Sequence, residues 1–240
     1  QKTAYEIGVR LVGSEMCIRD SFYLVKLGVN LTGCRVAEER PDSPFTIGYL
    51  ARIAPEKGLH LLADAFKLVA QRAGSMPVRL RVAGWRGRGD RAYYTNVVEG
   101  LGNAGLMGSV EFIGEVDRAE KLRFLQSLDV LSVPTVYEDP KGLYVLEALA
   151  NGIPVVQPRH GSFPELLEWT GGGLLVEPNS SESLATGIEQ LMNDGPRRRA
   201  LGRSGMETVH ELFTAQAMAQ QTLSVYERFV RRGNARRGER

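Results

Sequence analysis

The stretch Tyr137-Glu-Asp-Pro-Lys-Gly-Leu-Tyr-Val-Leu-Glu-Ala-Leu-Ala-Asn-Gly-Ile-Pro-Val-Val156 decides the fold of this chain. It follows a short apolar run at 130–133, opens with two adjacent acids, turns at Pro140 and Gly142, and runs through helical spacing into another apolar strand. In open α/β sheets ligands bind where strands end, and helix N-termini attract phosphate. The stretch therefore predicts a strand–loop–helix–strand unit whose loop holds a polyhydroxylated, anionic ligand.

The helix of this stretch carries Glu147, eight residues after Asp139, and we expect Glu147 in its first turn. A carboxylate there suits the helix macrodipole. It could also accept two hydrogen bonds from the vicinal hydroxyls of a ribose or hexose. The backbone amides of Gly142, Leu143 and Tyr144 could meet a phosphate group, because glycine permits close approach.

Outward from this stretch, strand and helix signals alternate along the chain. Apolar runs predict strands at 46–49, 78–83, 110–113, 130–133, 153–157 and 174–176. Helical spacing and capping residues predict helices at 58–73, 91–102, 118–128, 163–168, 181–193 and 196–210, and a last one to about 231. Strands separated by helices predict an α/β fold, a Rossmann-like doubly wound parallel sheet in one domain.

Several helix starts have capping signals. Asp117 with Glu120 three residues later predicts a capping box, and Asn179 is the expected cap of the helix at 181–193. Pro196 suits the first turn of a helix, and Thr214 can cap the final one. These signals fix where four helices should begin.

Composition excludes several classes of protein. The 240 residues carry a net charge of +2, which gives no reason to expect nucleic acid as a partner. The two cysteines, Cys17 and Cys34, make neither a disulfide framework nor a metal site, so a reducing, cytoplasmic compartment is expected. No apolar run in the sequence reaches the length of a membrane span.

The two ends of the chain differ from its centre. Residues 1–21 fit neither structural period and resemble a translated sequencing-adapter artefact; the alternative is a genuine but irregular segment. Residues 22–45 are expected to form an interdomain linker and entering strand, residues 46–230 the folded domain, and residues 231–240 a disordered basic tail. The tail leaves room for weak attraction to anionic lipid at the inner face of a membrane. We expect the chain to be a fragment that continues upstream.

The loop after the first strand carries two cations, Arg52 and Lys57, followed by Gly58. Arginine offers a bidentate fork and lysine a compact charge, a combination suited to a diphosphate. An isolated pair of this kind is more often two solvated surface cations. Their position at the end of a strand favours the functional interpretation.

The loop after the second strand, from Gly84 to Gly89, has glycines that superficially match a dinucleotide-binding motif. No helix begins within it as that motif requires, so we expect a flexible loop at the rim of the ligand cleft. Trp85 could stack on a ligand, although such a residue more often packs.

Taken together, these residues resemble the C-terminal, nucleotide-sugar-binding domain of retaining glycosyltransferases with the GT-B fold, of the large family 4 type (glycosyl transferases group 1). The resemblance covers residues 22–229. It rests on motifs in a fixed order: Arg52-x4-Lys57-Gly58, Phe112-Ile113-Gly114, the acid-x7-Glu147 region with its Gly-Leu turn, the run 147–156 and the turn 161–165. It implies that the chain is the C-terminal half of a GT-B fold.

The resemblance implies a role for each matching residue. Arg52 and Lys57 would bind the diphosphate of the donor and stabilise the departing nucleotide. Glu147 would hold the ribose hydroxyls, and the turn at Gly142 and Leu143 would supply amides to the phosphate or the sugar. The first acid of the pair would touch the hydroxyls of the transferred sugar, and residues 112–114 would border the base.

Two positions depart from the family pattern. The first acid is usually glutamate, whereas this chain has Asp139 at that spacing; Glu138 could take its place if the loop shifts. An aromatic residue often precedes the Gly-Leu turn, and here it is Lys141, which either reaches phosphate or is only solvated.

The family implies transfer of a hexose from a nucleoside diphosphate-sugar donor with retention at the anomeric carbon, without a metal ion or other cofactor. The acceptor would bind to an N-terminal domain that this chain lacks, so the isolated fragment is expected to be inactive. A non-catalytic nucleotide-sugar-binding module or pseudoenzyme is the alternative. A third hypothesis is a GT-B nucleotide-sugar epimerase. Enzymes of that kind, however, lack the combination of Arg-x4-Lys with an acid pair.

Overall fold

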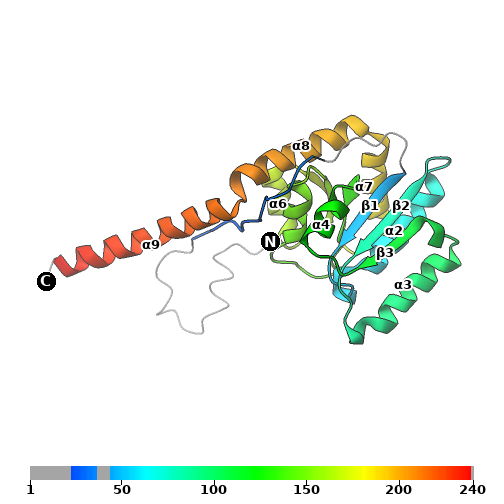
Figure 1. Ribbon diagram of the computed structural model, residues 1–240, viewed down its shortest axis with the longest axis horizontal. Coiled ribbons are helices and arrows are strands. Elements are labelled where there is room, and N and C mark those ends of the chain that lie inside the picture. The colour runs from blue at the N-terminus through cyan, green and yellow to red at the C-terminus, as the bar shows by residue number, and fades with distance from the viewer. Residues whose placement is uncertain (1–22, 37–43, 239–240) are drawn as a thin grey trace. The chain divides into compact units, whose positions relative to one another are not determined.

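The computed structural model describes residues 23–36 and 44–238 (Figure 1). The segment compared with an adapter artefact, residues 1–21, lies outside the described residues. The chain divides into two compact units, one spanning Val29–Glu211 and one combining Gln1–Gly28 with Leu212–Arg240. The larger unit carries the whole sheet.

The larger unit is built on a six-stranded sheet in which every neighbouring pair is parallel. Its strands are β1 (Phe45–Leu50), β2 (Val78–Ala83), β3 (Val110–Gly114), β4 (Val130–Leu131), β5 (Val155–Pro158) and β6 (Gly173–Val176). Their order across the sheet is β3-β2-β1-β4-β5-β6. The predicted doubly wound parallel α/β fold is therefore confirmed.

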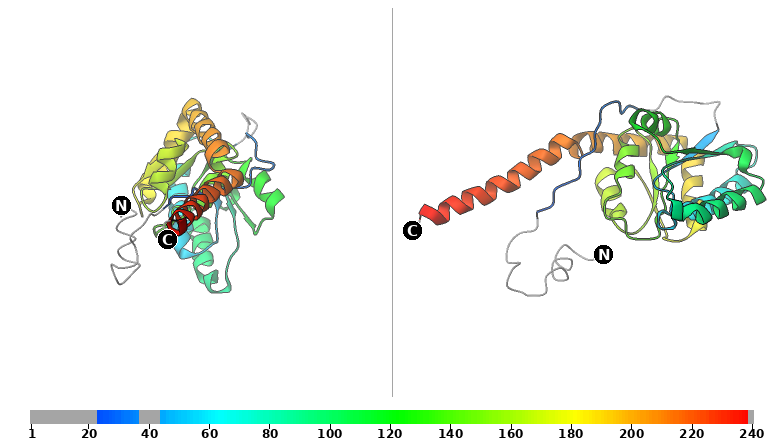
Figure 2. Two further views of the ribbon diagram at one scale, coloured as in Figure 1. Left: turned by 90° about the vertical axis from the view of Figure 1, so that its left-hand side faces the viewer. Right: turned by 60° about the horizontal axis from the view of Figure 1, so that its bottom comes forward.

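Helices flank the sheet in the larger unit, whereas the last helix of the chain belongs to the smaller unit. The α-helices are α2 (Leu59–Arg72), α3 (Arg91–Asn103), α4 (Arg118–Leu125), α5 (Leu143–Leu149), α6 (Phe163–Thr170), α7 (Ser181–Asn193), α8 (Gly195–Leu212) and α9 (Ala215–Gly238). Short 3-10 helices lie at η1 (Pro55–Lys57), η2 (Arg88–Asp90) and η3 (Met107–Ser109). Right-handed crossovers place α2 and α3 on one face and α4, α5 and α6 on the other, as can be followed in Figure 2.

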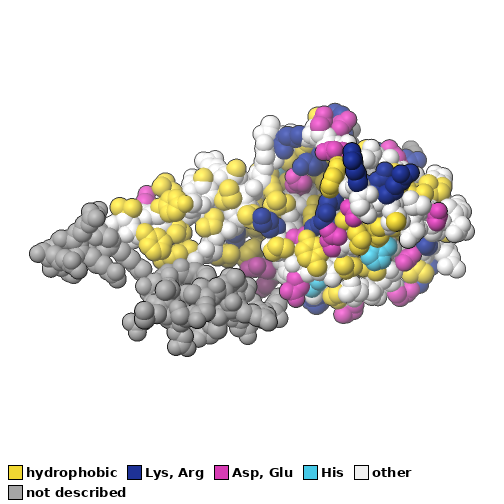
Figure 3. Space-filling model, turned by 90° about the horizontal axis from the view of Figure 1, so that it is seen from below, with side chains coloured by type: hydrophobic (Ala, Val, Ile, Leu, Met, Phe, Trp, Pro, Cys, Tyr) yellow, Lys and Arg dark blue, Asp and Glu magenta, His cyan; other side chains and the backbone are white. Residues whose placement is uncertain are grey.

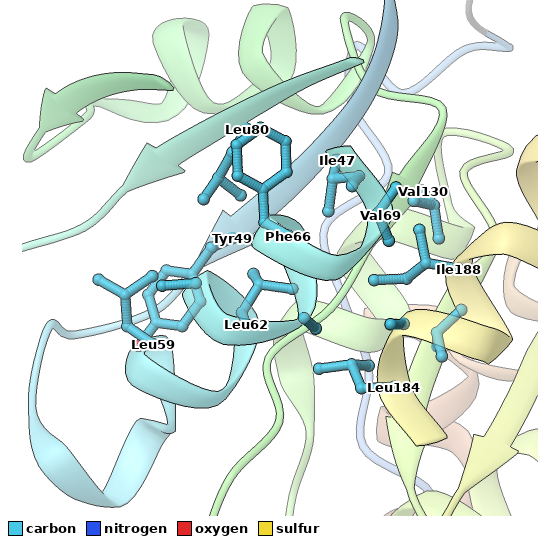
Figure 4. Close-up of a cluster of buried hydrophobic side chains, with 14 of the residues drawn as sticks. Ile47, Tyr49, Leu59, Leu62, Phe66, Val69, Leu80, Val130, Leu184 and Ile188 are labelled. Atoms are coloured by element: carbon cyan, nitrogen blue, oxygen red, sulfur yellow. The ribbon is translucent and has the colours of Figure 1, made fainter. Parts of the chain in front are cut away.

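The main hydrophobic core lies between the sheet and the layer that contains α2 and α7 (Figure 4). Leu62, Phe66 and Val69 of α2 are fully buried against strand residues such as Ile47 and against Ile188 of α7. The apolar positions of α2 recur every three or four residues, which is why the sequence predicted this helix. This core fixes the strand ends that carry the loops of interest.

The strand order reverses direction at the centre of the sheet. From β1 the chain runs outward through β2 and β3, and then returns to place β4 on the other side of β1. In such sheets the loops at the carboxyl ends of the two central strands separate and leave a crevice for a ligand. Here these are the loop that follows β1 and the loop that follows β4.

Helix α8 lies close to the backbone of its neighbours. A side chain at Gly202 would meet the carbonyl oxygen of Gly152 at 2.1 Å, and one at Gly205 would meet the Cα of Gly172 at 3.0 Å. His210 Nε2 lies 2.9 Å from the carbonyl oxygen of Ala150. Small residues on one side of α8 therefore let it pack against the C-terminal end of α5.

The smaller unit combines an extended segment with α9. Thr214 caps α9 as predicted, because its hydroxyl accepts the amide of Ala217 at 2.8 Å. The amide of Lys26 donates to Gln221 at 3.0 Å, so the extended segment lies along the helix. Apolar side chains gather on the surface of α9 (Figure 3), among them Leu223 and Tyr226.

Several boundaries differ from the sequence-based expectations. Helix α9 continues through residues 231–238, where the sequence predicted a tail, although Gly233 lies within this stretch. Ser180 rather than Asn179 caps α7: its hydroxyl accepts the amide of Ser183 at 3.1 Å, whereas Asn179 has a φ of 56°. The capping box of Asp117 and Glu120 is present, but α4 ends at Leu125.

Candidate functional site

The loop after β1 holds the two cations singled out in the sequence. Its path is fixed by the hydroxyl of Tyr49, which donates to the carbonyl oxygen of Arg52 at 3.0 Å. The guanidinium of Arg52 is half exposed and pairs with Glu56 in the same loop. Lys57 ends η1 and points across to the loop after β4.

The loops after β1 and β4 touch through their backbones. A side chain at Gly58 would lie 1.8 Å from the carbonyl oxygen of Pro134, so only glycine permits this approach. Gly58 also has a φ of 72°, which glycine adopts without strain. The amide of Val136 donates to the carbonyl oxygen of Glu56 at 3.0 Å. Main-chain contacts therefore hold these two loops together at the centre of the sheet.

Asp139 is the centre of a hydrogen-bonded cluster, with only 5% of its surface exposed. Its Oδ1 accepts the amides of Lys141 and Gly142 at 3.0 and 3.2 Å. Its Oδ2 accepts Lys57 Nζ at 2.7 Å and the hydroxyls of Tyr137 and Tyr144 at 3.2 and 3.1 Å. Five donors thus converge on one carboxylate, and we call these groups the Asp139 cluster.

The electrostatics of this cluster follow from its burial and its donors. Burial works to raise the pKa of Asp139, but the hydrogen bond from Lys57 and the two backbone amides outweigh it and lower the pKa to about 2. The pKa of Lys57 is raised, because Asp139 and Tyr137 outweigh the effect of burial on its ammonium. Burial, reinforced by Asp139, raises the pKa of Tyr144. The pair is therefore ionised throughout the physiological pH range.

The other residues of the opening stretch lie around this cluster. Glu138 is exposed beside the buried Asp139, and Lys141 and Leu143 are also exposed. Gly142 has a φ of 57° and precedes α5, as expected for a turn that needs glycine. Its amide, however, is engaged by Asp139 and does not face solvent as a free donor.

Glu147 lies in the second turn of α5 and not in the first, because α5 begins at Leu143. The helix macrodipole therefore does not explain its position. Its Oε1 accepts Lys121 Nζ of α4 at 2.5 Å, and both side chains are partly exposed. Tyr144 and Glu147 are three residues apart and so occupy one side of α5. That spacing places the Lys121–Glu147 pair next to the Asp139 cluster.

The loops after β2 and β3 are joined to the loop after β1. A side chain at Gly84 would meet the carbonyl oxygen of Ala51 at 1.8 Å. The amide of Gly84 donates to the carbonyl oxygen of Gly114 at 2.7 Å. The amide of Ile53 donates to the carbonyl oxygen of Trp85 at 2.8 Å, and the Trp85 ring is exposed. Gly84 therefore has a structural reason to be glycine, while the loop does lie beside the Arg52 loop.

The predicted base-bordering segment, 112–114, ends the edge strand β3. The ring of Phe112 packs edge-on against Tyr94 at 5.2 Å, and Ile113 is partly buried. A side chain at Gly114 would meet nothing within 4 Å. Space is therefore open directly above the end of this strand.

Two sets of groups at the site were not predicted from the sequence. The hydroxyls of Tyr137 and Tyr144 hold Asp139, and Lys121 pairs with Glu147. Both tyrosines belong to the opening stretch, so they could have been considered there. Lys121 is 26 residues before Glu147 and carries no local signal of its partner.

Chemically, the site offers one lysine ammonium and one arginine guanidinium for anions, and carboxylates for hydroxyl groups. Among residues 23–36 and 44–238, no group of three histidine, cysteine or carboxylate side chains is placed to hold a metal ion. Over the same residues, every helix is too short or too polar to cross a membrane.

Comparison with known proteins adds an independent line of evidence. The family model described as Glycosyl transferases group 1 matches residues 34–208. An uncharacterized glycosyltransferase of Methanocaldococcus jannaschii is 29% identical over 187 residues, which cover 78% of this chain and 45% of that protein. The phosphatidyl-myo-inositol mannosyltransferase of Mycobacterium leprae is 28% identical over 211 residues, covering 86% of this chain and 54% of that protein.

The fold is also found in solved structures. Sucrose-phosphate synthase from Thermosynechococcus elongatus matches with a TM-score of 0.74 at 26% identity, over 85% of this chain and 51% of that one. The parallel six-stranded sheet with flanking helices matches that of GT-B glycosyltransferases. The chain spans about half the length of each of these three proteins.

Proposed function

The chain belongs to the glycosyl transferases group 1 family, and from this premise we propose that it is the donor-binding half of a retaining glycosyltransferase of the family 4 type. Its ligand is a nucleoside diphosphate-sugar, bound in the crevice between the loops after β1 and β4. Lys57 and Arg52 bind the diphosphate, and Glu147 holds the ribose. The exposed Glu138 contacts the transferred hexose beside the buried Asp139, which orients Lys57, and the segment at 112–114 borders the base.

One observation carries this proposal: Lys57 and Asp139 meet at 2.7 Å across the point where the strand order reverses. A cation and a carboxylate from two different loops are thus held at the place where α/β sheets bind ligands. The ammonium of Lys57 has a third N–H that neither Asp139 nor Tyr137 uses, and this N–H can donate to a phosphate oxygen.

The chemical role of these cations is electrostatic. Departure of the nucleoside diphosphate develops negative charge on its terminal phosphate, which Lys57 and Arg52 stabilise. The acceptor attacks on the face that the diphosphate leaves, so the anomeric configuration is retained without a protein nucleophile. The acceptor site belongs to the part of the polypeptide outside this chain. We expect the chain alone to bind the donor without transferring its sugar.

Calorimetric titration of the chain with UDP-glucose, GDP-mannose and ADP-glucose tests the proposal. One of these donors should bind, and Lys57→Ala should weaken its binding about tenfold or more, because a charged hydrogen bond is lost. Lys67→Ala removes a lysine of α2 that is paired with Asp64; it is the matched control and should bind as the wild type does. No binding by the wild type, or unchanged binding by folded Lys57→Ala and Glu147→Ala variants, would contradict the proposal.

A second candidate is a donor-binding module without transferase activity. The observation that favours it is the saturation of Asp139 by five donors, which leaves that carboxylate little capacity for a sugar hydroxyl. Assay of the full-length gene product with the donor that binds distinguishes the two. Turnover supports the transferase, and donor binding without any turnover supports the binding module.

A further inference from the structure

Lys121 and Glu147 use only part of their hydrogen-bonding capacity within the part of the protein that the structure describes. Glu147 Oε1 accepts Lys121 Nζ at 2.5 Å. Among the residues that the structure describes, Glu147 Oε2 accepts no hydrogen bond, and Lys121 donates to Glu147 alone. The two side chains are 27% and 29% exposed, so the remaining groups can be reached by a ligand.

The two helices that carry the pair are held in fixed relative positions. Helix α4 begins with a complete capping box, in which Asp117 accepts the amide of Glu120 at 2.8 Å. Near its C-terminal end, Gln126 donates to Asn151 at 3.0 Å, and Asn151 donates to the carbonyl oxygen of Glu147 at 2.9 Å. Lys121 and Glu147 therefore face each other on a rigid frame, as a specific binding site requires.

Another cationic side chain of α4, that of Arg118, is committed elsewhere. Arg118 donates to the carbonyl oxygens of Asn30 and Thr32 at 3.1 and 2.6 Å. Lys121 is thus the cation of α4 that is directed at Glu147.

The free groups of the pair match a vicinal diol. A hydroxyl group both donates and accepts, so one hydroxyl can donate to Glu147 Oε2 while its neighbour accepts from Lys121 Nζ. Both hydrogen bonds are charge-assisted and therefore strong. A lone carboxylate would accept from both hydroxyls and leave their acceptor capacity unused. The pair satisfies the diol more completely.

We propose that Lys121 and Glu147 together bind the two ribose hydroxyls of the donor, so that Lys121 is a specificity-determining residue for ribonucleotides. This inference rests on the proposed function, because it deepens the donor site. It adds a residue from α4, the helix that follows β3, to the donor site. The nucleotide then bridges both halves of the sheet.

The test is the preference of the chain for a ribonucleotide over its deoxy form. Binding of UDP, 2′-deoxy-UDP and 3′-deoxy-UDP is measured by calorimetry, with GDP and ADP and their 2′-deoxy and 3′-deoxy forms in parallel. For the wild type, the ratio of ribo to deoxy affinity should be about tenfold or more with each deoxy form, since one charged hydrogen bond is lost with each hydroxyl. Lys121→Met should bring one of the two ratios close to one and Glu147→Gln the other, because each side chain contacts a different hydroxyl.

Control variants separate recognition from folding. Lys121→Arg keeps a charged donor and should retain most of the preference. Lys67→Met removes a lysine from the ion pair on α2 and should change nothing. Melting temperatures report whether each variant is folded, and Lys121→Gln replaces Lys121→Met if the latter is not.

The outcomes are distinct. Wild-type ratios for both deoxy forms in folded Lys121→Met overturn the inference and leave donor binding standing. A wild-type chain that binds the ribo form and both deoxy forms equally overturns it as well. A wild-type chain that binds no nucleoside diphosphate overturns the proposed function and this inference together.

Discussion

Two lysine–carboxylate pairs lie near each other in this domain. They differ in their exposure and in how many hydrogen bonds each carboxylate accepts within the protein. In the Lys57–Asp139 pair the side chains are 17% and 6% exposed, and Asp139 has four donors besides Lys57. In the Lys121–Glu147 pair the side chains are 27% and 29% exposed, and one carboxylate oxygen accepts no hydrogen bond from the part of the chain that the structure describes.

This difference distinguishes a charged pair that supports the structure from one that can bind a ligand. A buried carboxylate must be compensated by hydrogen bonds, so the Asp139 cluster holds two loops together and orients Lys57. A partly exposed pair contributes little to stability and keeps capacity for a ligand. The same chemical pair therefore supports the architecture in one place and offers recognition in the other.

The largest expected effect is the loss of the buried carboxylate. Asp139→Ala leaves Lys57, two hydroxyls and two amides without their acceptor, and should lower the free energy of unfolding by about 4 kcal/mol. Glu147→Ala, its counterpart in the exposed pair, should cost less than about 1 kcal/mol. Chemical denaturation of both variants measures the contrast, and equal losses would remove the distinction drawn between the pairs.

A second way to break the buried pair acts through the backbone. Gly58→Ala adds a carbon 1.8 Å from the carbonyl oxygen of Pro134 at a φ of 72°, which forces the two loops apart. We expect a loss of about 3 kcal/mol in the free energy of unfolding, from strain and overpacking.

Gly74 provides the matched control for this change, because its φ is 60° and an added side chain would meet nothing within 4 Å. Gly74→Ala should cost only the backbone strain, about 1 kcal/mol. A loss in Gly58→Ala no larger than in Gly74→Ala would show that the contact with Pro134 is not a constraint.

Acid should weaken the buried pair through Asp139. Because its pKa is lowered from 3.8 to about 2 in the folded protein, its contribution to stability is complete above pH 4 and is lost as the pH falls toward 2. Asp139→Asn removes this titration. The difference in unfolding free energy between wild type and Asp139→Asn should therefore shrink between pH 4 and pH 2, and a difference that stays constant would contradict the assignment.

The smallest expected effect concerns a single hydroxyl group of the Asp139 cluster. Tyr144→Phe removes one of the five donors to Asp139 and should cost about 1 kcal/mol in unfolding free energy. Tyr226→Phe, on the exposed surface of α9, should change stability by no more than a few tenths of that. Equal effects of the two substitutions would show that the Tyr144 hydroxyl is not part of the cluster's support.

The features that the sequence predicted well are those determined by neighbouring residues. The apolar spacing of α2 and the capping box of Asp117 and Glu120 depend on residues within one or two turns, and both are present. The doubly wound topology followed from the alternation of strands and helices, because parallel strands require crossovers. Local pattern therefore gave most of the architecture.

The features that the sequence did not predict depend on distant partners or on helix ends. Lys121 meets Glu147 only because α4 and α5 pack side by side, and Lys57 meets Asp139 only because β1 and β4 are neighbours. The cap of α7 was shifted by one residue, since both Asn179 and Ser180 are capable of capping. Local pattern cannot choose between such alternatives, nor measure how fully a carboxylate is satisfied.

The loops at the carboxyl ends of β1, β2 and β3 are joined by main-chain hydrogen bonds and by the close approach of Gly84 to Ala51. Their shape is thus largely independent of the side chains that they display, such as the exposed Trp85 and Arg52. Substitutions at those positions can alter what the rim contacts while the loops keep their course. The domain therefore has considerable evolvability at its rim, where new ligand preferences can arise by single replacements without a matching change elsewhere in the fold.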